Sequence, residues 1–177
     1  DSTVVAITGG GAGGGTTGVG AALDTTVSAK TVKAAIDDDS DADAVKATVN
    51  AKKDVVIDAA ASENLVSVTG GFAGGGTTGV GGAVSLGVMK NDVQARIGEK
   101  ATVDADGNAG VNAQDDTTAV MTAGAAAGGG TTGVGGSLAV ATLLGSTKAT
   151  VGDEAVVNAR GLGDARTAGR HRRDQRP

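Results

Sequence analysis

The sequence contains no cysteine, tryptophan or tyrosine, one phenylalanine (Phe72) and one proline (Pro177) among 177 residues. Without cysteine, a disulfide scaffold is excluded. Without aromatic rings, a compact core lacks the side chains that usually bury the largest areas. The apolar residues that remain are mostly alanine and valine, so any core must be thin. A thin core in a chain of this length suits a quasi-one-dimensional stack of repeats better than a sphere.

Long hydrophobic runs are missing as well. No stretch approaches the roughly 20 apolar residues of a membrane-spanning helix, so we expect no membrane insertion. The chain opens on Asp1 without a leader segment, and we expect it to be an excerpt or a processed product. Net charge is −5, and six of the 15 basic residues lie after Ala159. The body before them is therefore strongly acidic, which disfavours nucleic acid as a partner.

Glycine, by contrast, is abundant, with 32 residues. The block Ala-Gly-Gly-Gly-Thr-Thr-Gly-Val-Gly occurs unchanged at 12–20, 73–81 and 127–135, at spacings of 61 and 54 residues. The seven extra residues of the first spacing fall in the acidic run 37–43, and the flanking segments stay in register. An insertion confined to one polar segment is typical of a surface loop in a repeat protein.

This self-similarity divides the chain into two parts. Residues 1–160 form a repeat region with modules at about 12–72, 73–126 and 127–160, the last of them incomplete. Residues 161–177 form a basic tail that includes Arg170, His171, Arg172 and Arg173 and departs from the repeat. We expect this tail to be poorly structured.

Apolar residues within a module alternate with polar ones at period two. Examples are Val55/Ile57/Ala59, Val93/Ala95/Ile97, Ala101/Val103/Ala105 and Ala109/Val111/Ala113. Such alternation is typical of strands with one buried face. The sequence therefore predicts an all-β fold. Near-identical copies at a 54-residue period favour a coil whose turns stack their strands in parallel, a β-solenoid, over a hairpin meander.

The strand starts at 93, 101 and 109 lie eight residues apart, with bends at glycine, aspartate or asparagine. This interval favours two turns of three short faces per module, with three turns of about 18 residues as the alternative. Glycine permits unusual backbone geometry and close approach of neighbouring chains. The blocks themselves leave the backbone path open.

The glycine block together with the segments Val-x-Ala-x-Ile and Ala-x-Val-x-Ala resembles the repeat region of large bacterial leukotoxin-like and filamentous haemagglutinin-like surface adhesins. The similarity covers nearly all of residues 1–160. It implies a right-handed parallel β-helix that forms a stalk, exported by a two-partner or autotransporter route and displayed at the bacterial cell surface. The secretion domain and membrane component of that family have no counterpart in these residues.

Three patterns in the sequence resemble parts of known ligand sites. The glycine blocks lack the lysine of a phosphate-binding loop and the strand–helix context of a dinucleotide fingerprint, so we interpret them as structural. Asp39, Asp41 and Asp43 have the spacing of the first half of a calcium loop, but Ala44 and Asn50 replace the required glycine and glutamate. In Asp104-Ala-Asp106-Gly107-Asn108 the glycine comes two places early. A solvated loop is favoured for both acidic segments, and calcium is the only cofactor that the sequence suggests.

Catalytic chemistry has little support. The only histidine, His171, lies in the tail, and the pairs Asp115-Asp116 and Asp153-Glu154 are expected at exposed turns. A glycosidase would need aligned carboxylates and aromatic platforms for sugar. The sequence therefore predicts a non-enzymatic protein.

Two functional hypotheses remain. The first is a structural stalk segment of a secreted or surface-displayed adhesin, with neighbouring repeats of the parent chain and a host or cell-surface ligand as partners. The second is a self-assembling extracellular filament subunit whose partners are other copies of itself, because an uncapped solenoid end can stack on another.

Overall fold

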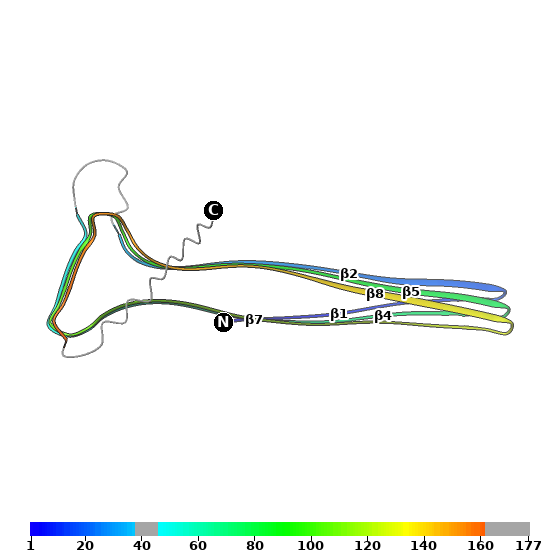
Figure 1. Cartoon of the computed structure of the whole chain (residues 1–177). Coiled ribbons are helices and arrows are strands. Elements are labelled where there is room, and N and C mark those ends of the chain that lie inside the picture. Colours follow the sequence, from blue (N-terminus) through cyan, green and yellow to red (C-terminus); the bar gives the residue numbers. More distant parts are fainter. Residues whose placement is uncertain (38–45, 162–177) are drawn as a thin grey trace, which may run out of the picture. The chain divides into compact units, whose positions relative to one another are not determined.

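The computed structural model describes residues 1–37 and 46–161. Within these residues there are nine β-strands and no helix. The strands form three sheets of three strands each, in the orders β1-β4-β7, β2-β5-β8 and β3-β6-β9 (Figure 1). Each strand therefore lies beside the strand that comes three strands earlier in the chain. This is the arrangement of a coil with three strands in each turn.

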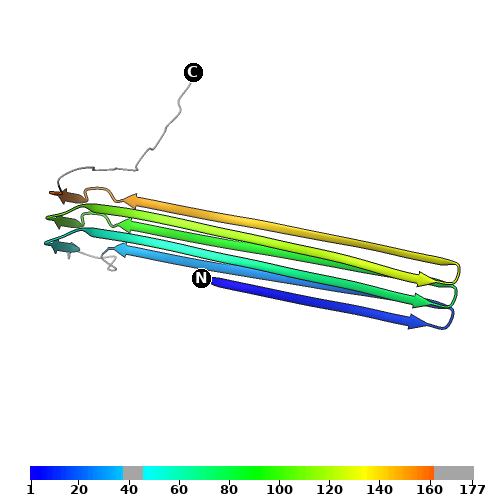
Figure 2. The same ribbon diagram turned by 90° about the horizontal axis from the view of Figure 1, so that it is seen from below.

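Each turn of the coil contains two long strands and one short strand (Figure 2). The first turn consists of β1 (Ser2–Gly14), β2 (Thr17–Ile36) and β3 (Thr48–Ala51). The second consists of β4 (Val55–Gly75), β5 (Thr78–Ile97) and β6 (Thr102–Ala105). The third consists of β7 (Ala109–Gly129), β8 (Thr132–Val151) and β9 (Val156–Ala159).

Successive turns pair in parallel and in register with the sequence repeat. Ser2 lies opposite Glu63, at the 61-residue offset, and Thr102 lies between Thr48 and Val156, at the 54-residue offset. The predicted parallel β-solenoid is therefore confirmed. The chain path in Figures 1 and 2 gives the coil a right hand, the usual hand of parallel crossovers.

One prediction was wrong: a module makes one turn, not two or three. The physical reason lies in the glycine blocks, which run in extended conformation inside the long strands. In each block only a glycine–threonine pair turns the chain: Gly15-Thr16, Gly76-Thr77 and Gly130-Thr131. The predicted bends after 97 and after 105 are present, but the strands that meet there are 20, 4 and 21 residues long.

Inward glycines let the two long sheets approach each other closely beside this turn. A Cβ atom on Gly75 would lie 2.0 Å from the carbonyl oxygen of Thr78, and one on Gly71 would lie 1.9 Å from the carbonyl oxygen of Gly82. The neighbouring Gly74 points outward and would meet nothing within 4 Å. A side chain would meet backbone atoms at the inward positions and open space at the outward ones. The block therefore requires glycine on its inward face.

The chain divides into two compact units that cut across the turns. One unit, here called the two-sheet unit, contains Asp1–Lys30, Ala61–Asn91 and Asp116–Gly145. The other, here called the three-sheet unit, contains the described residues of 31–60, 92–115 and 146–177. The short strands β3, β6 and β9 belong to the three-sheet unit.

The three-sheet unit has a conventional apolar core. Its inward side chains come from the start of β4, the end of β5 and the strand β6, and Val93 and Val103 are fully buried. The other buried apolar residues of this core are Val55, Ile57, Ala59, Ala95, Ile97, Ala101 and Ala105. These are the residues that the alternating pattern predicted to face inward. Ala109, Val111 and Ala113 share that phase in the third turn and are half-buried.

The two-sheet unit has the opposite arrangement. Its buried positions are glycine, alanine and polar residues, including Glu63, Ser67 and Ser85, with Leu65 and Met89 as the large apolar exceptions. Its outward positions carry the branched apolar side chains, and Ile7 on β1 is 79 % exposed. The second turn supplies most of the fully buried residues because turns lie on both sides of it, whereas β8 in the third turn is exposed on both faces.

Candidate functional site

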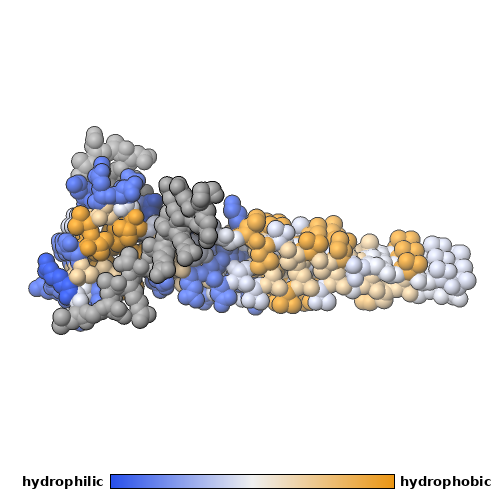
Figure 3. Space-filling view, in the orientation of Figure 1, coloured by the Kyte–Doolittle hydropathy of each residue, from blue (hydrophilic) through white to orange (hydrophobic). Residues whose placement is uncertain are grey.

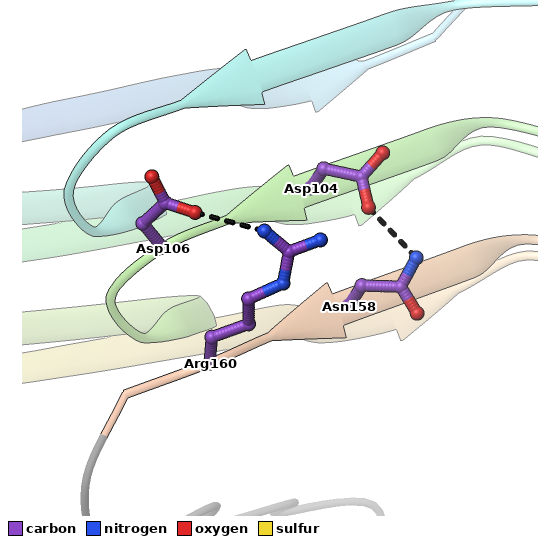
Figure 4. A network of polar contacts seen from close by, with 4 residues as sticks. All are labelled: Asp104, Asp106, Asn158 and Arg160. Atoms are coloured by element: carbon purple, nitrogen blue, oxygen red, sulfur yellow. Dashed lines mark hydrogen bonds and ion pairs between the residues drawn. The ribbon is translucent and has the colours of Figure 1, made fainter.

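A ladder of polar contacts joins successive turns on the outside of the three-sheet unit (Figure 4). The Nδ2 atom of Asn158 donates to Oδ1 of Asp104 at 2.7 Å. Two residues further along, a guanidinium nitrogen of Arg160 donates to Oδ1 of Asp106 at 3.1 Å. In both contacts the donor lies in the third turn and the carboxylate in the second, 54 residues earlier.

The same offset recurs between the same two turns, at the paired strands β4 and β7. The Nδ2 atom of Asn112 donates to Oδ1 of Asp58 at 3.0 Å, and the main-chain nitrogen of Asn108 donates to Oδ1 of Asp54 at 2.7 Å. These exposed contacts contribute little free energy each. Because each one forms only when whole repeats are in register, the ladder fixes the alignment of one turn on the next.

A buried polar cluster lies inside the two-sheet unit. Asp24 on β2 is 8 % exposed. Its carboxylate accepts hydrogen bonds from Ser67 at 2.6 Å and from Thr8 and Ser85 at 3.4 Å. The hydroxyls of Ser67 and Ser85 are themselves 2.7 Å apart. Since the four residues come from β1, β2, β4 and β5, the cluster connects both sheets and two turns.

A second buried carboxylate, Glu63, lies further along β4. It accepts a hydrogen bond from the hydroxyl of Ser28, and within the described chain its Oε2 atom has no hydrogen-bond partner. Close by, Asn91 donates to Thr117 across the interior at 2.6 Å. The narrow interior of this unit is thus lined by groups that a water-soluble protein normally presents to solvent.

A shallow depression of about 330 Å³ lies on the three-sheet unit. It is lined by Lys33, Ala34, Ala35, Asp37, Gln94 and Arg96. The guanidinium of Arg96 forms an ion pair with Asp37, and both residues belong to this lining. The arrangement offers no nucleophile next to a base.

The sequence-predicted calcium candidates Asp39, Asp41 and Asp43 lie outside the described residues. The second acidic segment is described, and its Asp104 and Asp106 accept the inter-turn contacts given above. Across residues 1–37 and 46–161 no three acidic, histidine or cysteine side chains gather as a metal site would require. His171 and the rest of the tail from residue 162 also lie outside the described part of the chain.

The two acidic pairs behave differently from each other. Asp153-Glu154 lies in a bend, as predicted, and Glu154 adopts the left-handed conformation with φ of 57°. Asp115-Asp116 was predicted at a turn, but both residues lie within the long strand β7. The strand continues through them because Ala113, Asp115 and Thr117 keep the inward phase of period two.

Sequence reasoning missed the apolar outer surface of the two-sheet unit. On β5 the outward residues Val80, Val84, Leu86 and Val88 alternate with inward glycine, alanine and serine. The signal was present as alternation, but alternation alone does not say which phase faces inward. Assigning the larger side chains to the interior is correct in the three-sheet unit and wrong here.

A comparison with protein-family models, with curated proteins and with solved structures finds no match to this chain. The described part of the chain contains no helix that is long and apolar enough to span a membrane.

Proposed function

We propose that this chain is a structural repeat segment, a non-catalytic stalk piece of an adhesin that is secreted or displayed at the bacterial cell surface. The observation that carries the proposal is that one sequence repeat corresponds to one turn of the coil. Each 54-residue copy closes one circuit of the coil and pairs along its strands with the next copy. A repeat of this kind exists to stack, because it buries its inner face only on its neighbours.

Surface display and the adhesive role rest on the resemblance of the repeats to bacterial adhesin repeats. The partners are then neighbouring repeats of the parent chain and a ligand at the host or cell surface.

The alternative is a filament subunit that stacks on copies of itself. It is favoured by the sheet edges, since β1, β2 and β3 lie at one end of the described sheets and β7, β8 and β9 at the other. Charge weighs against it. Stacking a first turn on a third turn at the repeat offset would place Lys52, which follows β3, next to Arg160, which follows β9. Like charges directly opposite each other are destabilising.

Analytical ultracentrifugation and negative-stain microscopy of the purified chain separate the two functions. A stalk segment gives discrete particles whose mass does not grow with concentration. Fibres of indefinite length would support the filament instead. Hydrolytic activity on polysaccharide substrates would contradict both.

A further inference from the structure

The outer surface of the two-sheet unit contains no charged side chain over most of its length. The charged residues of this unit are Asp1, Asp24, Lys30, Glu63, Lys90 and Asp116. Asp24 and Glu63 are buried inside. The other four lie within two residues of the ends of the segments that form the unit. Between those ends and the glycine turns, both outer faces are uncharged.

The face formed by β2, β5 and β8 is the more apolar of the two. The repeat places large outward side chains beside each other in successive turns: Val19, Val80 and Val134 in one row, and Leu23, Val84 and Leu138 in the next. The opposite face, formed by β1, β4 and β7, exposes Val5, Ile7, Val68, Phe72 and Val120 among outward glycines and uncharged polar residues. Hydrophobic side chains on the surface of this unit are visible in Figure 3.

Polarity reverses along a single strand. In β5 the outward residues change from Val84, Leu86 and Val88 to Lys90, Asp92, Gln94 and Arg96. At the same level the inward residues change from Gly81, Ser85 and Gly87 to Val93, Ala95 and Ile97. The later section is the arrangement for a strand with water outside. The earlier section is the arrangement for a strand with an apolar medium outside.

The outward apolar residues 80–88 of β5, here called the apolar band, have a length that fits a lipid bilayer. Residues 80–88 extend about 30 Å at about 3.3 Å per residue, which is about the thickness of the hydrocarbon core of a bilayer. The charge-free stretch begins at the same level on both sheets, because Asn91 on β5 is hydrogen-bonded to Thr117 on β7 across the interior. The turn at Gly76-Thr77 closes the band without any charge.

We propose that the two-sheet unit binds lipid, with both of its outer faces in contact with the acyl chains of a bilayer. A second copy of the chain could cover one face by sheet-on-sheet packing, but it would leave the opposite apolar face in water. A bilayer covers both faces at once. This proposal goes beyond the structural role and revises the expectation of no membrane insertion, which rested on the absence of a long apolar run.

The main-chain groups are compatible with this environment. The central strands β4 and β5 are paired on both sides by strands of the neighbouring turns, so their N–H and C=O groups need no water. The free edges of the first and third turns are where a further turn, from the parent chain or from another copy, would pair.

Site-specific fluorescence tests the proposal directly, because the chain has no cysteine. Leu86→Cys and Gln94→Cys place an environment-sensitive NBD dye on outward positions of β5, the first in the two-sheet unit and the second in the three-sheet unit. With phosphatidylcholine vesicles, we expect a blue shift and quenching by doxyl-labelled acyl chains at position 86, and neither change at position 94. Equal responses at the two positions would overturn the proposal. So would a blue shift at 86 that needs no lipid and grows with protein concentration, which would assign the face to a second copy.

A charge placed on the band provides a second measurement. Leu86 and Val88 are 37 % and 36 % exposed, so lysine at these positions can extend into solvent without disturbing the interior. We expect Leu86→Lys/Val88→Lys to lower the vesicle-bound fraction in flotation at least tenfold, while Gln94→Lys leaves it unchanged. Circular dichroism checks that the strand content of each variant is retained. Undiminished flotation of the folded double variant would contradict contact with acyl chains.

Discussion

The hydroxyl of Ser67 donates a hydrogen bond of 2.6 Å to the carboxylate of Asp24, from the second turn of the coil to the first. Ser67 is fully buried, and its oxygen is also 2.7 Å from that of Ser85. The two long sheets of the two-sheet unit are therefore joined by polar contacts, where a β-solenoid would be expected to use aliphatic packing.

Removing this donor should destabilise the fold. We expect Ser67→Ala to lower the free energy of unfolding by about 1–3 kcal/mol, because a buried carboxylate loses a hydrogen bond that nothing replaces. Ser62→Ala on the exposed face of the same strand is the control. Urea unfolding followed by circular dichroism measures both. Equal midpoints for the two variants would show that Asp24 does not depend on Ser67.

The glycine block offers a matched pair of substitutions. Gly75→Ala would place a Cβ atom 2.0 Å from the carbonyl oxygen of Thr78 and 2.9 Å from the nitrogen of Gly18. Because both contacts are with backbone, we expect a cost of about 1–3 kcal/mol or more. Gly74→Ala meets nothing within 4 Å and should leave the thermal midpoint unchanged or slightly raised. If both variants melt alike, the block is not selected for close approach of the sheets.

The bend between β5 and β6 contains a strained residue. Lys100 has φ of 56°, and Glu154, at the same place one turn later, has φ of 57°. A left-handed conformation costs a non-glycine residue about 1–2 kcal/mol. We therefore expect Lys100→Gly to raise the thermal midpoint and Lys100→Val, with its branched Cβ, to lower it. Glu99→Gly, at an adjacent position without positive φ, should not raise the thermal midpoint.

End-to-end stacking of two copies should depend on Lys52. Replacing it with aspartate would put a carboxylate next to Arg160 of the neighbouring copy and restore the Asp–Arg contact seen between Asp106 and Arg160. Replacing a like-charged surface pair with an oppositely charged one stabilises the contact by up to about 1 kcal/mol. We expect Lys52→Asp to strengthen self-association several-fold at low salt, with the gain lost at high salt. Sedimentation velocity across a concentration series provides the measurement, and Lys53→Asp is the control.

The sequence predicted the fold class because alternation and repetition point to the same structure. Val93, Ala95 and Ile97 were predicted to face inward and are almost completely buried. The period of the repeat, read as an offset between paired strands, agrees with the observed register at Thr48, Thr102 and Val156.

The number of turns in a repeat was not predictable in the same way. Glycine has no side chain whose polarity marks an inward or outward position, so the blocks hid the extended path of the longest strands. The reversed polarity of the two-sheet unit was hidden for a different reason. Val84 and Ser85 alternate in the same way whichever of them faces the interior, and only the closeness of the opposite sheet decides it.

One circuit of the coil uses 54 residues, yet neighbouring strands are only about 4.8 Å apart. Each additional copy therefore adds very little height for the material it contains. What each copy adds is lateral surface, one more long strand in each of the two long sheets, so the number of repeats sets the area that the two apolar faces present.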